Sequence, residues 1–165
     1  MEIEDDYTQQ LGKLIFTKSV KGPVTQEEAE GALTFTVTTV IDNKTMYVQK
    51  DGTVKETPYT FHLNDKYNDE RIFKVETDAE GNETYTATFD KLPIGQKFTV
   101  TETNTTIVDE YGNPYKLAED TVTSKESDEI SATPATVEIE DVYTQQLGKL
   151  VFTKSVKGPV SKAEA

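Results

Sequence analysis

The chain has 165 residues, of which 35% are hydrophobic, and a formal net charge of −13 at pH 7. Its length is sufficient for a domain with its own core, whereas its acidity argues against nucleic acid and anionic membrane surfaces as partners. The chain has no cysteine, which excludes disulfide bonds, thiolate metal sites and a cysteine nucleophile. No apolar run approaches the roughly 20 residues that span a bilayer, so we expect no membrane insertion.

The beginning of the chain recurs at its end. Residues 2–24, EIEDDYTQQLGKLIFTKSVKGPV, return as residues 138–160 with only two substitutions. A near-identical return at a fixed interval is typical of an array of repeats. We therefore expect residues 1–11 to be the end of a preceding repeat with its linker, residues 12–143 to form one complete repeat, and residues 144–165 to be a linker and the start of the next repeat.

Apolar residues alternate with polar ones, many of them threonine, along most of the chain. This period of two is typical of half-buried antiparallel strands. Turn-forming residues separate the alternating segments, and their spacing predicts an all-β sandwich. The inward-facing positions are, in chain order, Leu14, Phe16, Phe35, Val37, Tyr59, Phe61, Leu63, Phe73, Val75, Tyr85, Ala87, Phe89, Phe98, Val100, Val137 and Ile139.

One short helical turn is predicted near residues 25–30. Thr25 and Glu28 have the spacing of a capping box and follow Pro23, and Gly31 is placed to end the turn. We expect this turn to be a structural connector.

Three ionisable residues fall on the predicted inward face of three different strands. They are in phase with apolar neighbours on their own strands: Lys18 with Leu14 and Phe16, Glu102 with Phe98 and Val100, and Asp141 with Val137 and Ile139. Unpaired charges in a core cost several kcal/mol each, so we expect the three side chains to meet. They form the candidate site.

The chemistry of such a site follows from burial, which disfavours the charged forms of an amine and an acid. A neutral Lys18 amine is a nucleophile and a neutral Asp141 carboxyl group is an electrophile, and positioning them in contact favours attack. Glu102 would shuttle protons, and the product would be an amide between the two side chains. Two alternatives remain open: an ordinary buried ion cluster, or a bulge that shifts one of the three residues into solvent.

The same residues resemble a known family, the collagen-adhesin B-type (CnaB-like) Ig domains of Gram-positive pilins and surface adhesins. The resemblance covers most of one repeat and lies in three motifs: Leu14-Ile15-Phe16-Thr17-Lys18, Leu92-Pro93-Ile94-Gly95 followed by Phe98-Thr99-Val100-Thr101-Glu102, and Val137-Glu138-Ile139-Glu140-Asp141. It implies an Ig-like β-sandwich whose first and last strands are parallel neighbours, joined by an autocatalytic isopeptide bond. The order Lys, Glu, then Asn or Asp is that of the family.

Two features depart from the common family pattern. Asp141 stands where pilin-type members commonly have Asn, so water rather than ammonia would leave. The stretch from Asn64 to Asp90 is longer than expected, which indicates an inserted hairpin of open role.

Other polar residues carry weaker signals. His62 alternates away from Phe61 and Leu63 and is expected to face solvent, so we predict no metal site there. Asp65, Asn68, Asp69 and Glu70 offer oxygen ligands without the spacing of a calcium loop, so bound calcium stays open. We expect no cofactor, and no enzyme beyond a single self-cross-linking turnover, because no phosphate loop, Ser/His pair or spaced histidines are present.

The resemblance implies a structural stalk or spacer repeat of an adhesin or pilus-like protein at the Gram-positive cell surface, anchored to the cell wall. We expect Lys18 and Asp141 to be cross-linked with Glu102 as proton shuttle, and Asp5 and Lys154, their counterparts in the flanking repeats, to stay unreacted. Neighbouring repeats of the same chain are the expected partners, in a monomer whose flanks leave strand swapping open. The alternative is an adhesive module that binds a host protein or glycan without a cross-link.

Overall fold

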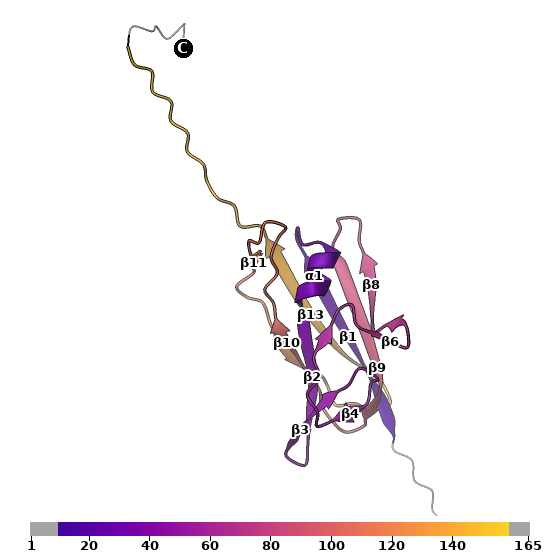
Figure 1. The fold of residues 1–165 in the computed structure, drawn as a ribbon. Coiled ribbons are helices and arrows are strands. Elements are labelled where there is room, and N and C mark those ends of the chain that lie inside the picture. The colour runs from indigo at the N-terminus through magenta and orange to yellow at the C-terminus, as the bar shows by residue number, and fades with distance from the viewer. Residues whose placement is uncertain (1–9, 159–165) are drawn as a thin grey trace, which may run out of the picture.

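The computed structural model describes residues 10–158, which form a two-layered β-sandwich with one short helix (Figure 1). The prediction of an all-β sandwich is confirmed. One sheet has the strand order β11 (Lys116–Leu117), β13 (Ala135–Thr144), β1 (Leu11–Lys21), β9 (Glu83–Pro93) and β8 (Phe73–Thr77). The other has the order β12 (Ser124–Glu126), β10 (Thr99–Asn104), β2 (Thr34–Ile41), β3 (Lys44–Val48) and β4 (Val54–Lys55), with β5 (Phe61–His62) also paired to β2.

The core lies between the two sheets and follows the alternation in the sequence. Along β1, every second residue from Gly12 to Val20 is buried, and β13 alternates in the same way from Ala135 to Tyr143. Phe16 packs edge-on against Phe35 and Phe73, with ring centroids 5.3 and 5.9 Å apart, so the ring of Phe16 contacts both sheets.

The strands β1 and β13 lie side by side and run parallel, as the resemblance implied. In their register Phe16 is paired with Val137 and Lys18 with Ile139. Because the two strands run in the same direction, the described chain begins at one end of the sandwich and leaves it at the other (Figure 1). The first strand and the last strand are therefore direct neighbours at the centre of one sheet.

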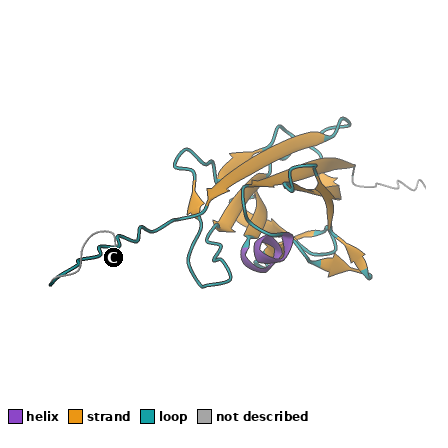
Figure 2. Ribbon diagram, turned by 90° about the horizontal axis from the view of Figure 1, so that it is seen from above, coloured by secondary structure: helices purple, strands orange, loops and turns teal. Residues whose placement is uncertain are grey.

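The helix α1 (Gln26–Ala32) lies outside the strands of the sandwich (Figure 2). Its capping box is present as predicted: Thr25 Oγ1 accepts from the Glu28 backbone N–H, and the Glu28 side chain accepts from the Thr25 N–H. The prediction that Gly31 ends the helix was wrong. The helix continues to Ala32 and is capped by Leu33, whose fully buried side chain leads into β2.

The inserted hairpin is formed by β6 (Lys66–Tyr67) and β7 (Glu70–Arg71), which pair only with each other. The Arg71 guanidinium forms an ion pair with Glu30 of α1 at 2.7 Å and donates to the backbone carbonyls of Leu63 and Phe73. These contacts hold the base of the hairpin against the sandwich and the helix.

Candidate functional site

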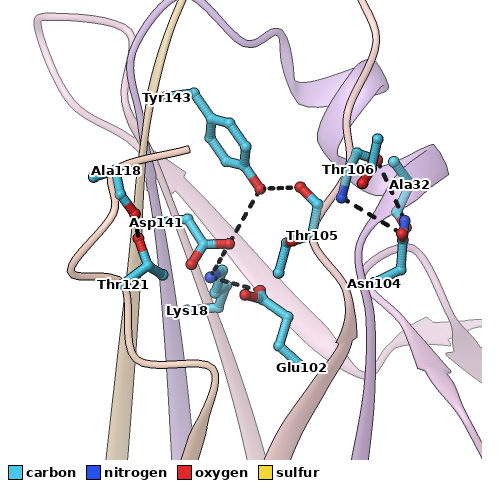
Figure 3. Close-up of polar contacts among 10 residues, drawn as sticks. All are labelled: Lys18, Ala32, Glu102, Asn104, Thr105, Thr106, Ala118, Thr121, Asp141 and Tyr143. Atoms are coloured by element: carbon cyan, nitrogen blue, oxygen red, sulfur yellow. Dashed lines mark hydrogen bonds and ion pairs between the residues drawn. The ribbon is translucent and has the colours of Figure 1, made fainter. Parts of the chain in front are cut away.

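The candidate site lies between the two sheets, where three strands bring Lys18, Glu102 and Asp141 together (Figure 3). Lys18 comes from β1 and Asp141 from the neighbouring parallel strand β13, whereas Glu102 comes from β10 of the opposite sheet. Ile139 of β13 is the register partner of Lys18, and Asp141 lies two residues after Ile139. Residues two positions apart on a strand share a face of the sheet. The pleat of β13 therefore places the Asp141 carboxyl group beside the Lys18 side chain.

The amine of Lys18 contacts both acids. Its Nζ lies 2.5 Å from Oδ2 of Asp141 and 2.7 Å from Oε2 of Glu102, and all three side chains have no solvent-exposed surface. The Nζ also lies 5.8 Å from the centroid of the Phe35 ring, within the range of a cation–π contact. None of the three residues is shifted into solvent by a bulge, so the inward phase that the sequence predicts is found for each of them.

Burial controls the protonation of Glu102. Desolvation raises its pKa from the ordinary value of 4.5 to about 8. The positive charge of Lys18 opposes this shift, whereas the charge of Asp141 and its hydrogen bond to Glu102 reinforce it. At neutral pH Glu102 therefore carries a proton.

A fourth residue, Tyr143, belongs to the site although the sequence patterns gave it no role. Its hydroxyl lies 2.6 Å from the backbone carbonyl of Thr105 and 3.2 Å from Oδ2 of Asp141 (Figure 3). Burial and the nearby Asp141 raise the pKa of the Tyr143 hydroxyl, so it stays protonated. The only signal in the sequence was its position two residues after Asp141 on the same face of β13.

The two flanking counterparts lie apart from the site. Lys154 belongs to residues 145–158, which follow β13 without regular secondary structure, and it is exposed. Asp5 lies outside the described residues. The structure thus assembles one Lys, Glu and Asp set within residues 10–158.

The remaining sequence candidates have structural partners of their own. His62 is exposed, as its alternation predicts. The Asp65 carboxylate accepts from the Tyr59 hydroxyl and the His62 backbone N–H, at 2.8 and 2.9 Å, and Asn68 and Asp69 form a turn with φ of 52° and 64°. Within residues 10–158 no cluster of His, Asp and Glu side chains has an arrangement that would hold a metal ion, and no helix is long and apolar enough to span a bilayer.

The chemistry open to this site is that of an amine held against a carboxyl group in a fully buried environment. An amine and a carboxyl group in contact can remain an ion pair or condense to an amide, and a neighbouring acid that carries a proton favours condensation by protonating the oxygen that leaves. Lys18, Asp141 and the protonated Glu102 supply these three groups.

Comparison with known proteins gave similarity to solved structures. No protein-family model and no curated protein sequence matches the chain. The major pilin from Streptococcus pyogenes, solved as the N168A mutant, aligns with a TM-score of 0.38 and 14% identity over 81% of this chain and 49% of the pilin. The pilus-presented adhesin Cpa aligns with a TM-score of 0.33 and 15% identity over 80% of this chain and 28% of the adhesin. The chain thus spans less than half the length of either protein.

Proposed function

We propose that this chain contains a structural repeat of a surface stalk, closed by an intramolecular amide bond between Lys18 and Asp141. The observation that carries the proposal is the contact of the Lys18 amine with Asp141 and Glu102 in a fully buried site. An ordinary buried ion pair needs only one acid. Burying a second acid beside it costs free energy of desolvation, so its presence indicates that the second acid has a function. The task we assign to Glu102 is proton transfer during bond formation.

The bond forms by condensation in which charge and atoms balance. The Lys18 ammonium and the Asp141 carboxylate exchange a proton, which gives a neutral amine and a neutral acid. The amine nitrogen attacks the Asp141 carboxyl carbon, a C–N bond forms and a C–O bond breaks, and one water leaves. Glu102 donates its proton to the departing oxygen and recovers one from the nitrogen, so it is unchanged at the end.

Tyr143 positions the Asp141 carboxyl group. Its hydroxyl donates to the backbone carbonyl of Thr105, at 2.6 Å, and also lies within hydrogen-bond distance of Asp141 Oδ2, at 3.2 Å. Tyr143 therefore orients the carboxyl group beside the Lys18 amine that attacks it.

The position of the bond explains why it suits a stalk. It joins the first strand to the last, so tension that enters at β1 passes through the amide to β13, and the residues between Lys18 and Asp141 carry little of the load. Closing a loop of this size also removes chain entropy from the unfolded state, which stabilises the fold by on the order of 4–5 kcal/mol. A chain without cysteine gains from the amide what disulfides provide in other extracellular proteins.

The near-identical segments at residues 2–24 and 138–160 support an array of such repeats. In this array each repeat uses its own Lys, Glu and Asp. In the 165-residue chain Asp5 and Lys154 stay unreacted, because the other members of their sets are not within it. The resemblance of the three sequence motifs to those of pilins and surface adhesins supports a stalk outside a Gram-positive cell, and we propose that it is anchored to the cell wall.

The proposal is tested by the intact mass of the purified chain beside Lys18→Ala and Asp141→Ala. We expect the wild-type chain to be lighter than the sum of its residues by one water, and each variant to have its full mass. A wild-type chain of full mass, isolated folded, would sink the proposal and leave a buried ion cluster.

A further inference from the structure

The two ends of the sandwich must come close together in an array. Glu2 recurs as Glu138, an interval of 136 residues, so the position of Leu11, where β1 begins, recurs as Leu147. The strand β13 ends at Thr144. Only Gln145 and Gln146 therefore separate the last strand of one repeat from the first strand of the next.

This linker is too short to keep the repeats apart. Three residue steps span at most about 11 Å between the Cα atoms of Thr144 and Leu147. Packed protein layers lie about 10 Å apart, so the loops around the exit of one repeat are within side-chain reach of the loops around the start of the next. So short a tether also gives a high effective concentration, and a weak contact between the two ends is enough to be populated.

The end at which the chain leaves the sandwich has a groove for such a contact. A groove of about 720 Å³ lies between α1 and the loop around residues 107–111, and Gln145, the first linker residue, forms part of its wall. Two apolar side chains at its rim are exposed: Val108 by 48% and Tyr111 by 78%. Tyr111 is the most exposed large hydrophobic side chain of the sandwich itself, residues 11–144.

The charges in this groove share one sign. Glu27, Glu28, Asp109 and Glu110 line it, and no Lys or Arg does. Both Oε atoms of Glu28 accept from the Tyr115 hydroxyl, at 2.9 and 3.1 Å, and Oδ1 of Asp109 accepts from the backbone N–H groups of Tyr111 and Asn113. Glu27 and Glu110 are therefore the acids most available to a partner with a positive charge.

The opposite end of the sandwich has complementary chemistry. A hollow of about 330 Å³ is lined by apolar side chains that include Leu11, Met46 and Pro93, together with Lys91 as its only charged residue. Leu11 is 47% exposed, and Ile94, the residue after Pro93, is 38% exposed. Large apolar side chains gathered at a surface commonly mark an interaction site.

We propose that the groove between α1 and residues 107–111 receives the Leu11 end of the following repeat, so that consecutive repeats dock into a stiff rod. Val108 and Tyr111 contact the apolar hollow, and Glu110 lies near the position of Lys91. This docking rests on the array in the proposed function, but it does not require the Lys18–Asp141 bond.

A two-repeat chain tests the docking. It is made by continuing the sequence after Ala165 with residues 30–145, because Ala165 occupies the repeat position of Ala29. The chain has no cysteine, so Thr88→Cys in each repeat places one spin label per repeat on an exposed position of β9, away from both ends. Pulsed electron paramagnetic resonance then gives the distribution of distances between the repeats.

We expect one narrow distance distribution, and a broad one in a chain with Val108→Ser and Tyr111→Ser in the first repeat. Tyr67→Ser, which removes another exposed tyrosine from the hairpin, is the matched control and should keep the narrow distribution. Because Val108 and Tyr111 are exposed, unfolding of the 165-residue chain should not change with their replacement.

Two results would overturn the docking. One is a wild-type distribution as broad as that of a chain with a long Gly-Ser insertion after Gln146; the other is a narrow distribution that the paired serine substitutions leave unchanged. Intact masses of the same samples report the amide bonds separately, so failure of the docking and failure of the cross-link can be told apart.

Discussion

The Nζ of Lys18 lies 2.5 Å from Oδ2 of Asp141, across the parallel pair of strands β1 and β13. The two residues belong to the first and last strands of the sandwich, so this single contact closes the fold. Glu102 reaches the same point from the opposite sheet. The site therefore forms only after both sheets have assembled, so the proposed bond would form late and lock a completed fold.

Removing the amine should destabilise the chain strongly. Lys18→Ala cannot form the proposed cross-link, which would cost on the order of 4–5 kcal/mol, and it leaves two acids buried without their lysine partner. We expect a large drop in the thermal unfolding temperature, measured by calorimetry. Lys13→Ala, on the exposed face of the same strand, is the control and should unfold like the wild-type chain; equal unfolding of the two variants would contradict the cross-link.

Replacing Glu102, the proposed proton shuttle, should leave the fold intact and slow the formation of the amide bond. Glu102→Gln keeps the shape of the side chain but cannot transfer a proton, and loss of general acid–base catalysis slows a reaction by about 10²–10⁴-fold. We expect the Glu102→Gln chain to be folded and to have its full mass at a time when the wild-type chain has already lost one water. Glu138→Gln, on the exposed face of β13, should react like wild type. A Glu102→Gln chain that cross-links at the wild-type rate would show that Glu102 has no part in the chemistry.

Bond formation should depend on pH through Glu102, whose pKa burial raises from 4.5 to about 8. Between these values the folded chain holds a proton that the unfolded chain has released, so the stability of the uncross-linked chain falls as the pH rises. We expect the rate of water loss to fall as the pH rises through about 8. The measurement uses chain recovered unfolded and uncross-linked, refolded at each pH and quenched for mass analysis; a rate that keeps rising through this range would contradict a protonated Glu102.

Gly22 controls how closely the end of β1 approaches β13. Its φ is +110°, and a Cβ on it would clash with the carbonyl oxygen of Tyr143. Gly81 has a similar φ of +85° and open space around it, so Gly81→Ala should cost about 1–2 kcal/mol from backbone strain alone. We expect Gly22→Ala to lower the free energy of unfolding by clearly more, because the Tyr143 backbone must move. If denaturant titrations give equal losses of unfolding free energy for Gly22→Ala and Gly81→Ala, the close approach of β1 to Tyr143 does not limit the residue at position 22.

The period of two along the strands is what made the site predictable. Burial of every second residue fixes which face Lys18, Glu102 and Asp141 occupy, because a shift by one residue would expose the apolar neighbours of each. The sequence does not predict that Glu102, on one sheet, lies directly opposite Lys18 and Asp141 on the other. That depends on how the two sheets pack, which no local pattern encodes.

Other contacts were missed for the same reason. The partner of Tyr143 is the Thr105 backbone carbonyl, in the loop that follows β10, and backbone carbonyls leave no mark in a sequence. Arg71 of the inserted hairpin pairs with Glu30 of α1, which lies far away along the chain. Gly31 was expected to end the helix from its residue type, but the burial of Leu33 decided where the helix ends.

The most direct test of the central claim is tandem mass spectrometry of a tryptic digest of the folded chain. Trypsin cleaves after a lysine with a free amine, so a cross-linked Lys18 is skipped and remains in peptide 14–21, joined to peptide 126–149, which contains Asp141. We predict one branched species with the summed mass of these two peptides less one water, whose fragments locate the bond at Lys18 and Asp141. Recovery of peptides 14–18, 19–21 and 126–149 at their separate masses, or of a branched species through Lys154 or Asp5 instead, would contradict the account.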